Sequence, residues 1–227
     1  SVTGTTEPTK VGVAVADVVT GLYAAVGAVA GIASRRPLQV EVGLLESAVS
    51  LLVNQASNAL VGGVVPRPSG NHHPNIVPYG PLACADTTLV IGAGNDGQFE
   101  ALCRVLSLEV PAAWQSNAGR VAARVEVLGA LESRLAGRTA AEWAVVLAGQ
   151  GIPCAPVQDL AQLQADPQLV ATGQLQRVPH PAGDVTVVGS PYRLDGVRPR
   201  VHDAPPLLGQ HTAEVLMALG LSAEQVE

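Results

Sequence analysis

The stretch that decides the fold is VGVAVADVVTGLYA, residues 11–24, because its pattern changes at one charged residue. Residues 11–16 are apolar and partly β-branched, which predicts a short strand. After Asp17 the apolar residues continue with helical spacing, and we expect this helix to reach residue 33. Asp17 is therefore predicted at a strand-to-helix junction, where aspartate is a favoured helix N-cap.

After this helix, the sequence predicts a second strand at 39–42 and a second long helix at 44–61, which ends at Gly62 and Gly63. Residues 62–81 are rich in Gly, Pro, Asn and His and have no periodicity, so they are predicted to form a long loop. Long loops inside compact proteins are often functional.

The rest of the chain alternates between short strands and helices. Thr139 and Glu142 have the spacing of a capping box, and Asp166 followed by Pro167 also predicts a helix start. Further expected elements are strands at 87–93 and 152–157, helices at 99–106, 120–136 and 212–219, and a hairpin at 175–192. The alternation is typical of the α/β class.

One apolar segment raises the question of a membrane. Residues 18–33 are almost wholly apolar, and Gly27 and Gly31 have the spacing of a helix-dimer motif. The run is shorter than the ~20 residues that cross a bilayer, and it contains mainly Ala, Gly and Val. We therefore predict a buried helix of a soluble protein, with no membrane contact.

Composition and charge exclude other classes of protein. A net charge of -6, aromatics at 3% and the lack of a Lys/Arg cluster argue against a nucleic-acid surface. Cys84, Cys103 and Cys154 are odd in number and lack CxxC spacing, so we predict neither a disulfide framework nor a metal site. Residues 1–10 have no signal-peptide pattern. These features predict a cytoplasmic protein.

Five stretches in matching order resemble the class III CoA-transferase family, also called CaiB/BaiF, which includes formyl-CoA transferase and α-methylacyl-CoA racemase. They span nearly the whole chain. The stretches are SVTG at 1–4 with VGVAVADVVTGLYA at 11–24, VEVGLLESA at 40–48, GNHHPNIVPY at 70–79, GIPCAPV at 151–157 and PLLGQHT at 206–212.

The resemblance implies that the chain is the C-terminal part of this fold: part of a Rossmann-like large domain plus a smaller α/β domain. Residues 1–80 would be the large-domain core with the catalytic aspartate and the active-site loop, 81–180 the small domain, and 181–227 a segment returning to the large domain. An N-terminal half not in this sequence would carry most CoA contacts. Relatives also have a longer basic turn where this chain has residues 34–39.

Asp17 matches the nucleophilic aspartate of the family. The ionised carboxylate of an aspartate attacks a thioester carbonyl without a base to activate it. The resemblance thus implies transfer of CoA between an acyl-CoA and a carboxylic acid, through an aspartyl anhydride and an aspartyl-CoA thioester. From the residues alone, the alternative is that Asp17 is a plain helix N-cap.

The GNHHPNIVPY loop matches the family's mobile segment over the active site. Gly70 would let the backbone approach a ligand closely, Asn71 would donate to an acyl oxygen, and His73 rather than His72 falls at the family's histidine position. By analogy, Leu44 would line the acyl pocket. The alternatives are a surface loop with solvated histidines and, for Leu44, an ordinary core residue.

Two other functions stay open at this point. One is racemisation at the carbon α to the thioester, in which Asp17 would move a proton together with a histidine from the absent half. The other is a catalytically incomplete fragment or assembly subunit. The expected partners are an acyl-CoA, with coenzyme A as substrate and not as a covalently bound cofactor, and a small carboxylic acid. The resemblance also implies an interlocked homodimer.

Overall fold

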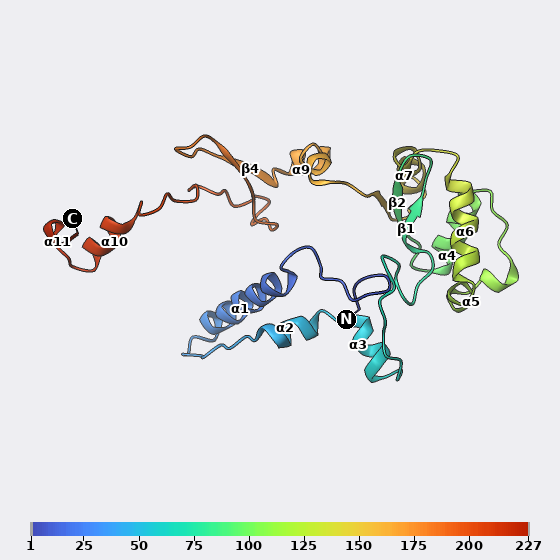
Figure 1. The fold of residues 1–227 in the computed structure, drawn as a ribbon, viewed down its shortest axis with the longest axis horizontal. Coiled ribbons are helices and arrows are strands. Elements are labelled where there is room, and N and C mark those ends of the chain that lie inside the picture. The colour runs from blue at the N-terminus through green and yellow to red at the C-terminus, as the bar shows by residue number, and fades with distance from the viewer. Residues whose placement is uncertain (1, 227) are drawn as a thin grey trace. The chain divides into compact units, whose positions relative to one another are not determined.

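The computed structural model describes residues 2–226 and divides into two units, residues 1–157 and 158–227. The first unit holds three N-terminal helices and a sheet with its own helices, and the second holds a hairpin and short helices (Figure 1). The mixed α/β class expected from the sequence is confirmed. The predicted division at residues 80 and 180 stays a prediction.

The N-terminal helices are α1 (Val15–Ser34), α2 (Leu44–Ser50) and α3 (Val53–Leu60). Arg35 caps the C-terminal end of α1: its backbone is left-handed with φ 54°, and its N–H donates to the carbonyl of Ile32. A hydrogen bond of 3.1 Å from the Tyr23 hydroxyl to Ser50 Oγ links α1 to α2.

Three predictions for this region are wrong. Within residues 2–226, neither 11–16 nor 39–42 is a strand, since no neighbouring strand satisfies their backbone N–H and C=O groups. The helix predicted at 44–61 breaks into α2 and α3, because Val53 has a positive φ of 43°.

Helix α1 is also not the buried helix that was predicted. None of its residues is buried, and Val18, Leu22 and Ile32 are more than half exposed. The apolar pattern is real, but within residues 2–226 too few side chains pack against this helix to cover it. By length and composition, α1 is the one helix of the described residues that meets the requirements for crossing a membrane.

The sheet of the first unit has three antiparallel strands in the order β1 (Tyr79–Ala83), β2 (Thr88–Gly92) and β3 (Cys154–Pro156). Strand β1 was missed, because its YGPLA sequence contains Gly and Pro and follows a loop directly. The side chains of β1 and β2 alternate, so that Leu82, Leu89 and Ile91 point into the core.

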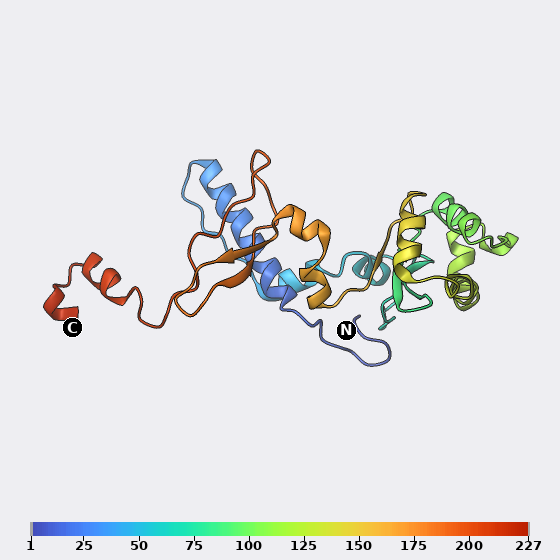
Figure 2. The same ribbon diagram turned by 90° about the horizontal axis from the view of Figure 1, so that it is seen from above.

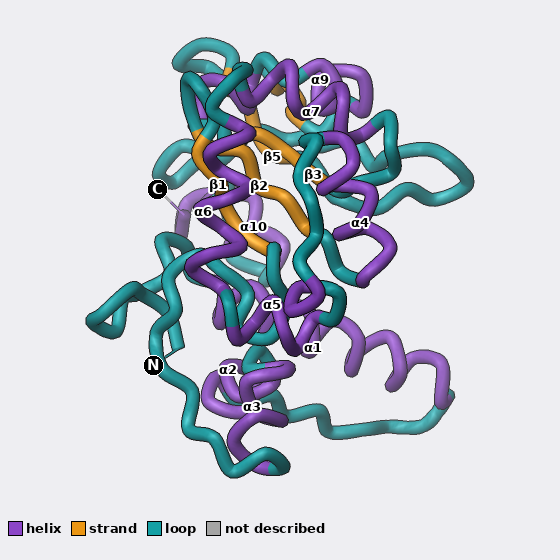
Figure 3. Tube along the Cα trace, turned by 90° about the vertical axis from the view of Figure 1, so that its right-hand side faces the viewer, coloured by secondary structure: helices purple, strands orange, loops and turns teal. Residues whose placement is uncertain are grey.

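Four helices share a core with this sheet. They are α4 (Asp96–Val105), α5 (Asn117–Ala122), α6 (Arg124–Leu135) and α7 (Ala140–Ala148), with a 3-10 turn at Ala112–Trp114. Two of them, α6 and α7, lie directly against the strands of the sheet. Figure 3 shows α6 crossing in front of β1. Three of these helices begin at side-chain caps, from Asn95, Ser116 and Thr139. The predicted capping box of Thr139 and Glu142 is confirmed.

The hydrophobic core lies between this sheet and its helices. Trp143 Nε1 donates to the Leu135 carbonyl at 2.8 Å, so the indole is buried without losing its hydrogen bond. The core side chains are Val77, Leu82, Leu89, Ile91, Ala93, Phe99, Leu102, Cys103, Leu106, Trp114, Val127, Leu131, Leu135, Ala140, Trp143, Leu147 and Ile152.

The second unit contains α8 (Leu160–Gln164), α9 (Pro167–Thr172), the hairpin of β4 (Leu175–Val178) and β5 (Val185–Val188), α10 (Thr212–Ala218) and α11 (Ala223–Val226), all drawn in orange to red (Figure 2). The predicted cap at Asp166 is confirmed, because its carboxylate accepts from the N–H groups of Gln168 and Leu169. The predicted hairpin is confirmed as well.

Candidate active site

A cavity of about 430 Å³ opens beside the loop that the sequence singled out. It brings together three of the predicted substrate-binding residues, Gly70, Asn71 and His73. The other lining residues are His72, Tyr79, Gly80, Pro81, Val90 and Val157. The cavity is thus built from the loop on one side and from the exposed face of the sheet on the other.

The loop also touches the N-terminal segment that leads to Asp17. Gly70 has a φ of 67° and donates its N–H to the carbonyl of Gly4 at 2.7 Å. The segment around Gly4 is itself closed by a bond of 3.0 Å from Thr9 N–H to the Thr3 carbonyl. A side chain at position 70 would be strained at this φ, which favours glycine. Two of the stretches that carry the family resemblance therefore meet at Gly70.

Gly80 is required where the loop folds back on β1. A Cβ at this position would lie 2.5 Å from His72 Nδ1 and 2.9 Å from the Asn71 carbonyl oxygen. The loop is held against the strand by the His73 N–H, which donates to the Tyr79 carbonyl at 2.7 Å. Any residue larger than glycine would push the loop away and open this side of the cavity.

The His73 ring is held in place at one nitrogen and on one face. Its Nδ1 accepts a hydrogen bond of 3.1 Å from the Asn75 N–H, and its plane stacks on the Tyr79 ring with centroids 5.4 Å apart. Because Nδ1 accepts, the proton of the neutral ring is assigned to Nε2. His73 therefore has a donor left for a ligand.

The surroundings of both histidines favour the neutral form of the ring. Burial, followed by the nearby Arg124 guanidinium, lowers the pKa of His73 below its ordinary value. The pKa of His72 is lowered by the same two causes, against a smaller opposing effect of Glu132. Nδ1 of His72 is buried and has no hydrogen-bond partner within residues 2–226. His72 lines the cavity and is half-buried, so it is not the fully solvated histidine of the surface-loop alternative.

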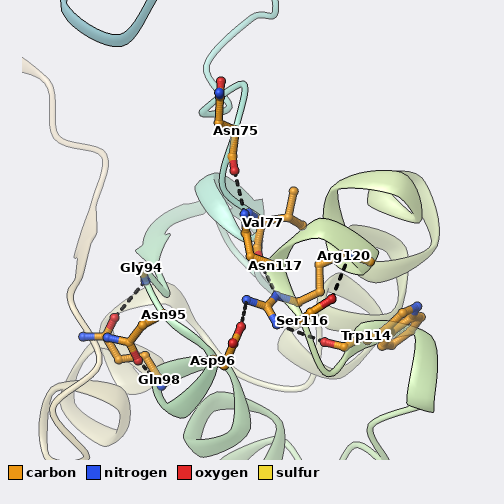
Figure 4. A network of polar contacts seen from close by, with 11 residues as sticks. Asn75, Val77, Gly94, Asn95, Asp96, Gln98, Trp114, Ser116, Asn117 and Arg120 are labelled. Atoms are coloured by element: carbon orange, nitrogen blue, oxygen red, sulfur yellow. Dashed lines mark hydrogen bonds and ion pairs between the residues drawn. The ribbon is translucent and has the colours of Figure 1, made fainter. Parts of the chain in front are cut away.

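Asn117 and Arg120 of α5 (Figure 4) and Arg124 of α6 hold the segment that follows the histidines. Asn117 bonds the backbone of Asn75 and Val77, Arg120 donates to the Val77 carbonyl at 2.8 Å, and Arg124 donates to the Pro74 carbonyl at 2.7 Å. This set was not predicted from the sequence, because residues 40 or more positions apart in the chain give no local signal.

Arg120 is the centre of this network. Its side chain is fully buried, yet each guanidinium nitrogen has a partner: the Val77 carbonyl, the Trp114 carbonyl at 2.9 Å and the Asp96 carboxylate at 2.7 Å. The guanidinium also stacks on Phe99, with its carbon 4.4 Å from the ring centroid. A charge buried in this way is tolerated because it is paired with a carboxylate and each of its nitrogens donates a hydrogen bond.

Asp17 lies in the first turn of α1 and is exposed. The helix N-cap is Ala14, and the Asp17 carboxylate makes no capping bond, so the plain N-cap interpretation is wrong. The first α-helical bond runs from the Val18 N–H to the Ala14 carbonyl at 3.1 Å, and the N–H groups of Ala16 and Asp17 precede it. The carboxylate thus lies beside the positive end of the helix dipole.

Neither Asp17 nor Leu44 lines the cavity beside the loop. Leu44 is the first residue of α2 and is 55% exposed, so it is not an ordinary core residue in this structure. Its contact with an acyl group stays a prediction. Within residues 2–226, no group of three His, Cys, Asp or Glu side chains is arranged to hold a metal ion.

Comparison with known proteins places this arrangement in a family. Residues 1–212 match CoA-transferase family III. The chain belongs to this family. It is 34% identical over 218 residues to the succinyl-CoA:glutarate CoA-transferase of Mus musculus, covering 92% of this chain and 50% of that protein. It is also 34% identical to the succinate–glutarate CoA-transferase of Agrobacterium fabrum, covering 94% of this chain and 55% of that protein.

A solved structure agrees with the family III assignment. A CaiB/BaiF family protein from Brucella suis is similar with a TM-score of 0.75 and 32% identity, covering 96% of this chain and 59% of that one. The family resemblance and the partial family fold predicted from the sequence are confirmed. The chain spans about half the length of the curated relatives it matches.

Proposed function

We propose that this chain carries the nucleophile of an enzyme that moves CoA between an acyl-CoA thioester and a carboxylic acid. The observation that carries the proposal is the position of Asp17: a free, exposed carboxylate at the start of α1, in the stretch that resembles the nucleophile motif of family III. Asp17 has no hydrogen bond or ion pair within residues 2–226 that would occupy it.

The first half of the reaction would load CoA onto the protein. A carboxylate oxygen of Asp17 attacks the thioester carbonyl carbon, the C–S bond breaks, and CoA leaves as a thiolate, which gives a mixed anhydride. The thiolate then attacks the Asp17 carbonyl carbon and releases the donor acid as a carboxylate. The product is an aspartyl-CoA thioester, so the energy of the original thioester is retained.

The second half would unload CoA onto the acceptor. The acceptor carboxylate attacks the aspartyl carbonyl carbon, expels CoA thiolate and forms a new anhydride. The thiolate attacks the acceptor's carbonyl carbon, and Asp17 leaves as a carboxylate. Each attack creates an oxyanion, which the N–H groups at the start of α1 are suited to stabilise when it forms on Asp17 itself.

The cavity residues would bind the acyl group or acid. Gly70 lets the backbone come close, the Asn71 amide donates to an acyl oxygen, and neutral His73 donates from Nε2. Leu44, which lies outside this cavity, is proposed by analogy with the family as an apolar wall of the acyl site. The names of the relatives above pair glutarate with succinyl-CoA in one case and with succinate in the other, so we infer a dicarboxylic acid as donor or acceptor. The interlocked homodimer and the cytoplasmic location remain part of this proposal.

The nucleophile is tested by mapping the acyl-enzyme. Trypsin cleaves after Lys10 and Arg35, and the peptide 11–35 between them contains Asp17 as its one carboxylate side chain. Incubation of the whole protein with succinyl-CoA, followed by hydroxylamine, should convert Asp17 to a hydroxamate, which adds mass to this peptide. The Asp17→Asn variant should show no such addition and should lose at least about 1,000-fold in transfer rate, because an amide is not a nucleophile here.

Controls separate this proposal from its alternatives. Glu46→Gln, which removes the carboxylate in the first turn of α2, should retain the hydroxamate on peptide 11–35. Unchanged turnover in Asp17→Asn would reject the nucleophile. Deuterium entering the α-carbon of the acyl-CoA from heavy water, with no transfer to glutarate, would favour racemisation instead. If the whole protein neither binds CoA nor transfers it, the non-catalytic alternative stands.

A further inference from the structure

The backbone at 74–77 is irregular, and side chains rather than strands satisfy it. Asn117 accepts from the Val77 N–H at 3.2 Å through Oδ1 and donates to the Asn75 carbonyl at 2.8 Å through Nδ2. One amide therefore replaces a neighbouring strand over this segment, since it supplies both an acceptor and a donor. Val77 is completely buried, so its N–H would otherwise be unsatisfied.

Asn75 connects this clamp to the cavity. Its carbonyl is held by Asn117, and its N–H donates to His73 Nδ1 at 3.1 Å. Its side-chain amide pairs with that of Asn58 in two bonds of 3.1 and 2.9 Å. The orientation of the Asn75 backbone therefore decides which nitrogen of His73 accepts and which carries the proton.

We propose that Asn117 is a positioning residue for His73. By holding Asn75, it aims the Asn75 N–H at Nδ1 and thereby keeps the proton of the ring on Nε2, the nitrogen that remains to donate to a carboxylate or acyl oxygen in the cavity. That the ligand is a carboxylate or acyl oxygen rests on the proposed function. The assignment of the His73 tautomer is independent of that function. Second-layer bonds of this kind commonly set the tautomer of a functional histidine.

Asn117 is better suited to this test than its neighbours in the network. Arg120 is fully buried, and its replacement would disturb the core. Asn117 is half-buried and is the first residue of α5, where a negative charge is favourable. Asn117→Asp therefore keeps the acceptor for Val77 and the start of the helix, and loses the donor to the Asn75 carbonyl.

The test is an imidazole ¹H–¹⁵N correlation spectrum of the 227-residue protein near pH 7.5, with His73→Gln to assign the resonance. The native protein should show Nδ1 as the unprotonated nitrogen of His73 and Nε2 as the protonated one. Asn117→Asp should shift the two nitrogens toward each other, as the two tautomers mix. Asn95→Asp is the matched control, since its Oδ1 also accepts at a helix start and has no bond to the loop.

Kinetics of the whole protein add a second measurement. If His73 binds the acid, Asn117→Asp should raise the KM for the acceptor acid roughly 10-fold or more, with Asn95→Asp unchanged. If the population of the Nε2–H tautomer of His73 is the same in Asn117→Asp as in the native protein, the proposal is overturned. If Asn117→Asp fails to fold, the same comparison is made with Asn117→Ser. Absence of transfer in the native protein would reject the proposed function and leave the tautomer result to judge the positioning role.

Discussion

Two parts of the first unit have similar apolar sequences and opposite environments. Residues 77–152 contain the whole core cluster, whereas α1, α2 and α3 bury only Ser47. Both parts contain helices with many Val, Leu and Ala residues. What differs is the partner: a sheet lies against α6 and α7, and α1 packs mainly along α2. An apolar helix becomes a core helix only where another element covers it.

The largest expected effect breaks the buried network of the core. Arg120→Met should lower the free energy of unfolding by roughly 3–5 kcal/mol, because the buried carbonyls of Val77 and Trp114 lose their donor and Asp96 loses its partner. Both tryptophans of the chain, Trp114 and Trp143, lie in this core, so their fluorescence during urea unfolding measures the loss.

Arg120→Lys provides the control for this substitution. Lysine keeps a positive charge for Asp96 but has no planar fork, so it cannot reach all three acceptors at once. Its loss should be smaller than that of Arg120→Met and still measurable. A Met variant as stable as the native protein would mean that the guanidinium contacts contribute nothing to the core.

The next effect compares one residue type in both environments. Leu131→Ala removes a fully buried side chain and should cost about 2–5 kcal/mol, including the cavity that it leaves. Leu22→Ala removes a side chain that is 62% exposed on α1 and should change the stability of the 227-residue chain by less than about 0.5 kcal/mol. Urea unfolding is followed by tryptophan fluorescence and by circular dichroism. Equal losses would show that α1 is covered in solution.

Local signals in the sequence predicted the elements whose cause is local. The capping box at Thr139, the cap at Asp166 and the hairpin at 175–192 each depend on residues within a few positions of one another, and all three are confirmed. The strands expected at 11–16 and 39–42 depend on a neighbouring strand that no local pattern reveals, and those predictions failed.

The candidate site likewise contains some residues that local sequence signals predicted and others that they did not. Gly70, Asn71 and His73 lie within four positions of one another, and the structure places them on one cavity. Asn117, Arg120 and Arg124 could not be predicted, because they act on backbone groups 40 to 50 positions away. A buried arginine also has no sequence signature: Arg120 looks like a surface charge on an amphipathic helix until its partners are known.

The smallest expected effect concerns the loop that carries His72 and His73. This loop connects α3, one of the exposed helices, to β1, which belongs to the core. Burial and Arg124 lower the pKa values of His72 and His73 in the folded chain, so the unfolded chain binds more protons as the pH falls below about 6.5. Their contribution to stability is therefore complete above the unfolded pKa and is lost as the pH falls through the folded values.

Stability of the core should decline between pH 7 and pH 5 for this reason. Asp86 and Glu142 also have lowered pKa values, because backbone N–H groups bond their carboxylates, but their protonation begins at lower pH. Urea unfolding measured at steps across this range should show the decline, and His72→Gln with His73→Gln should flatten it. A native profile already flat from pH 7 to 5 would show that the loop is not part of the cooperative core, because histidines that are solvated in both states leave stability independent of pH.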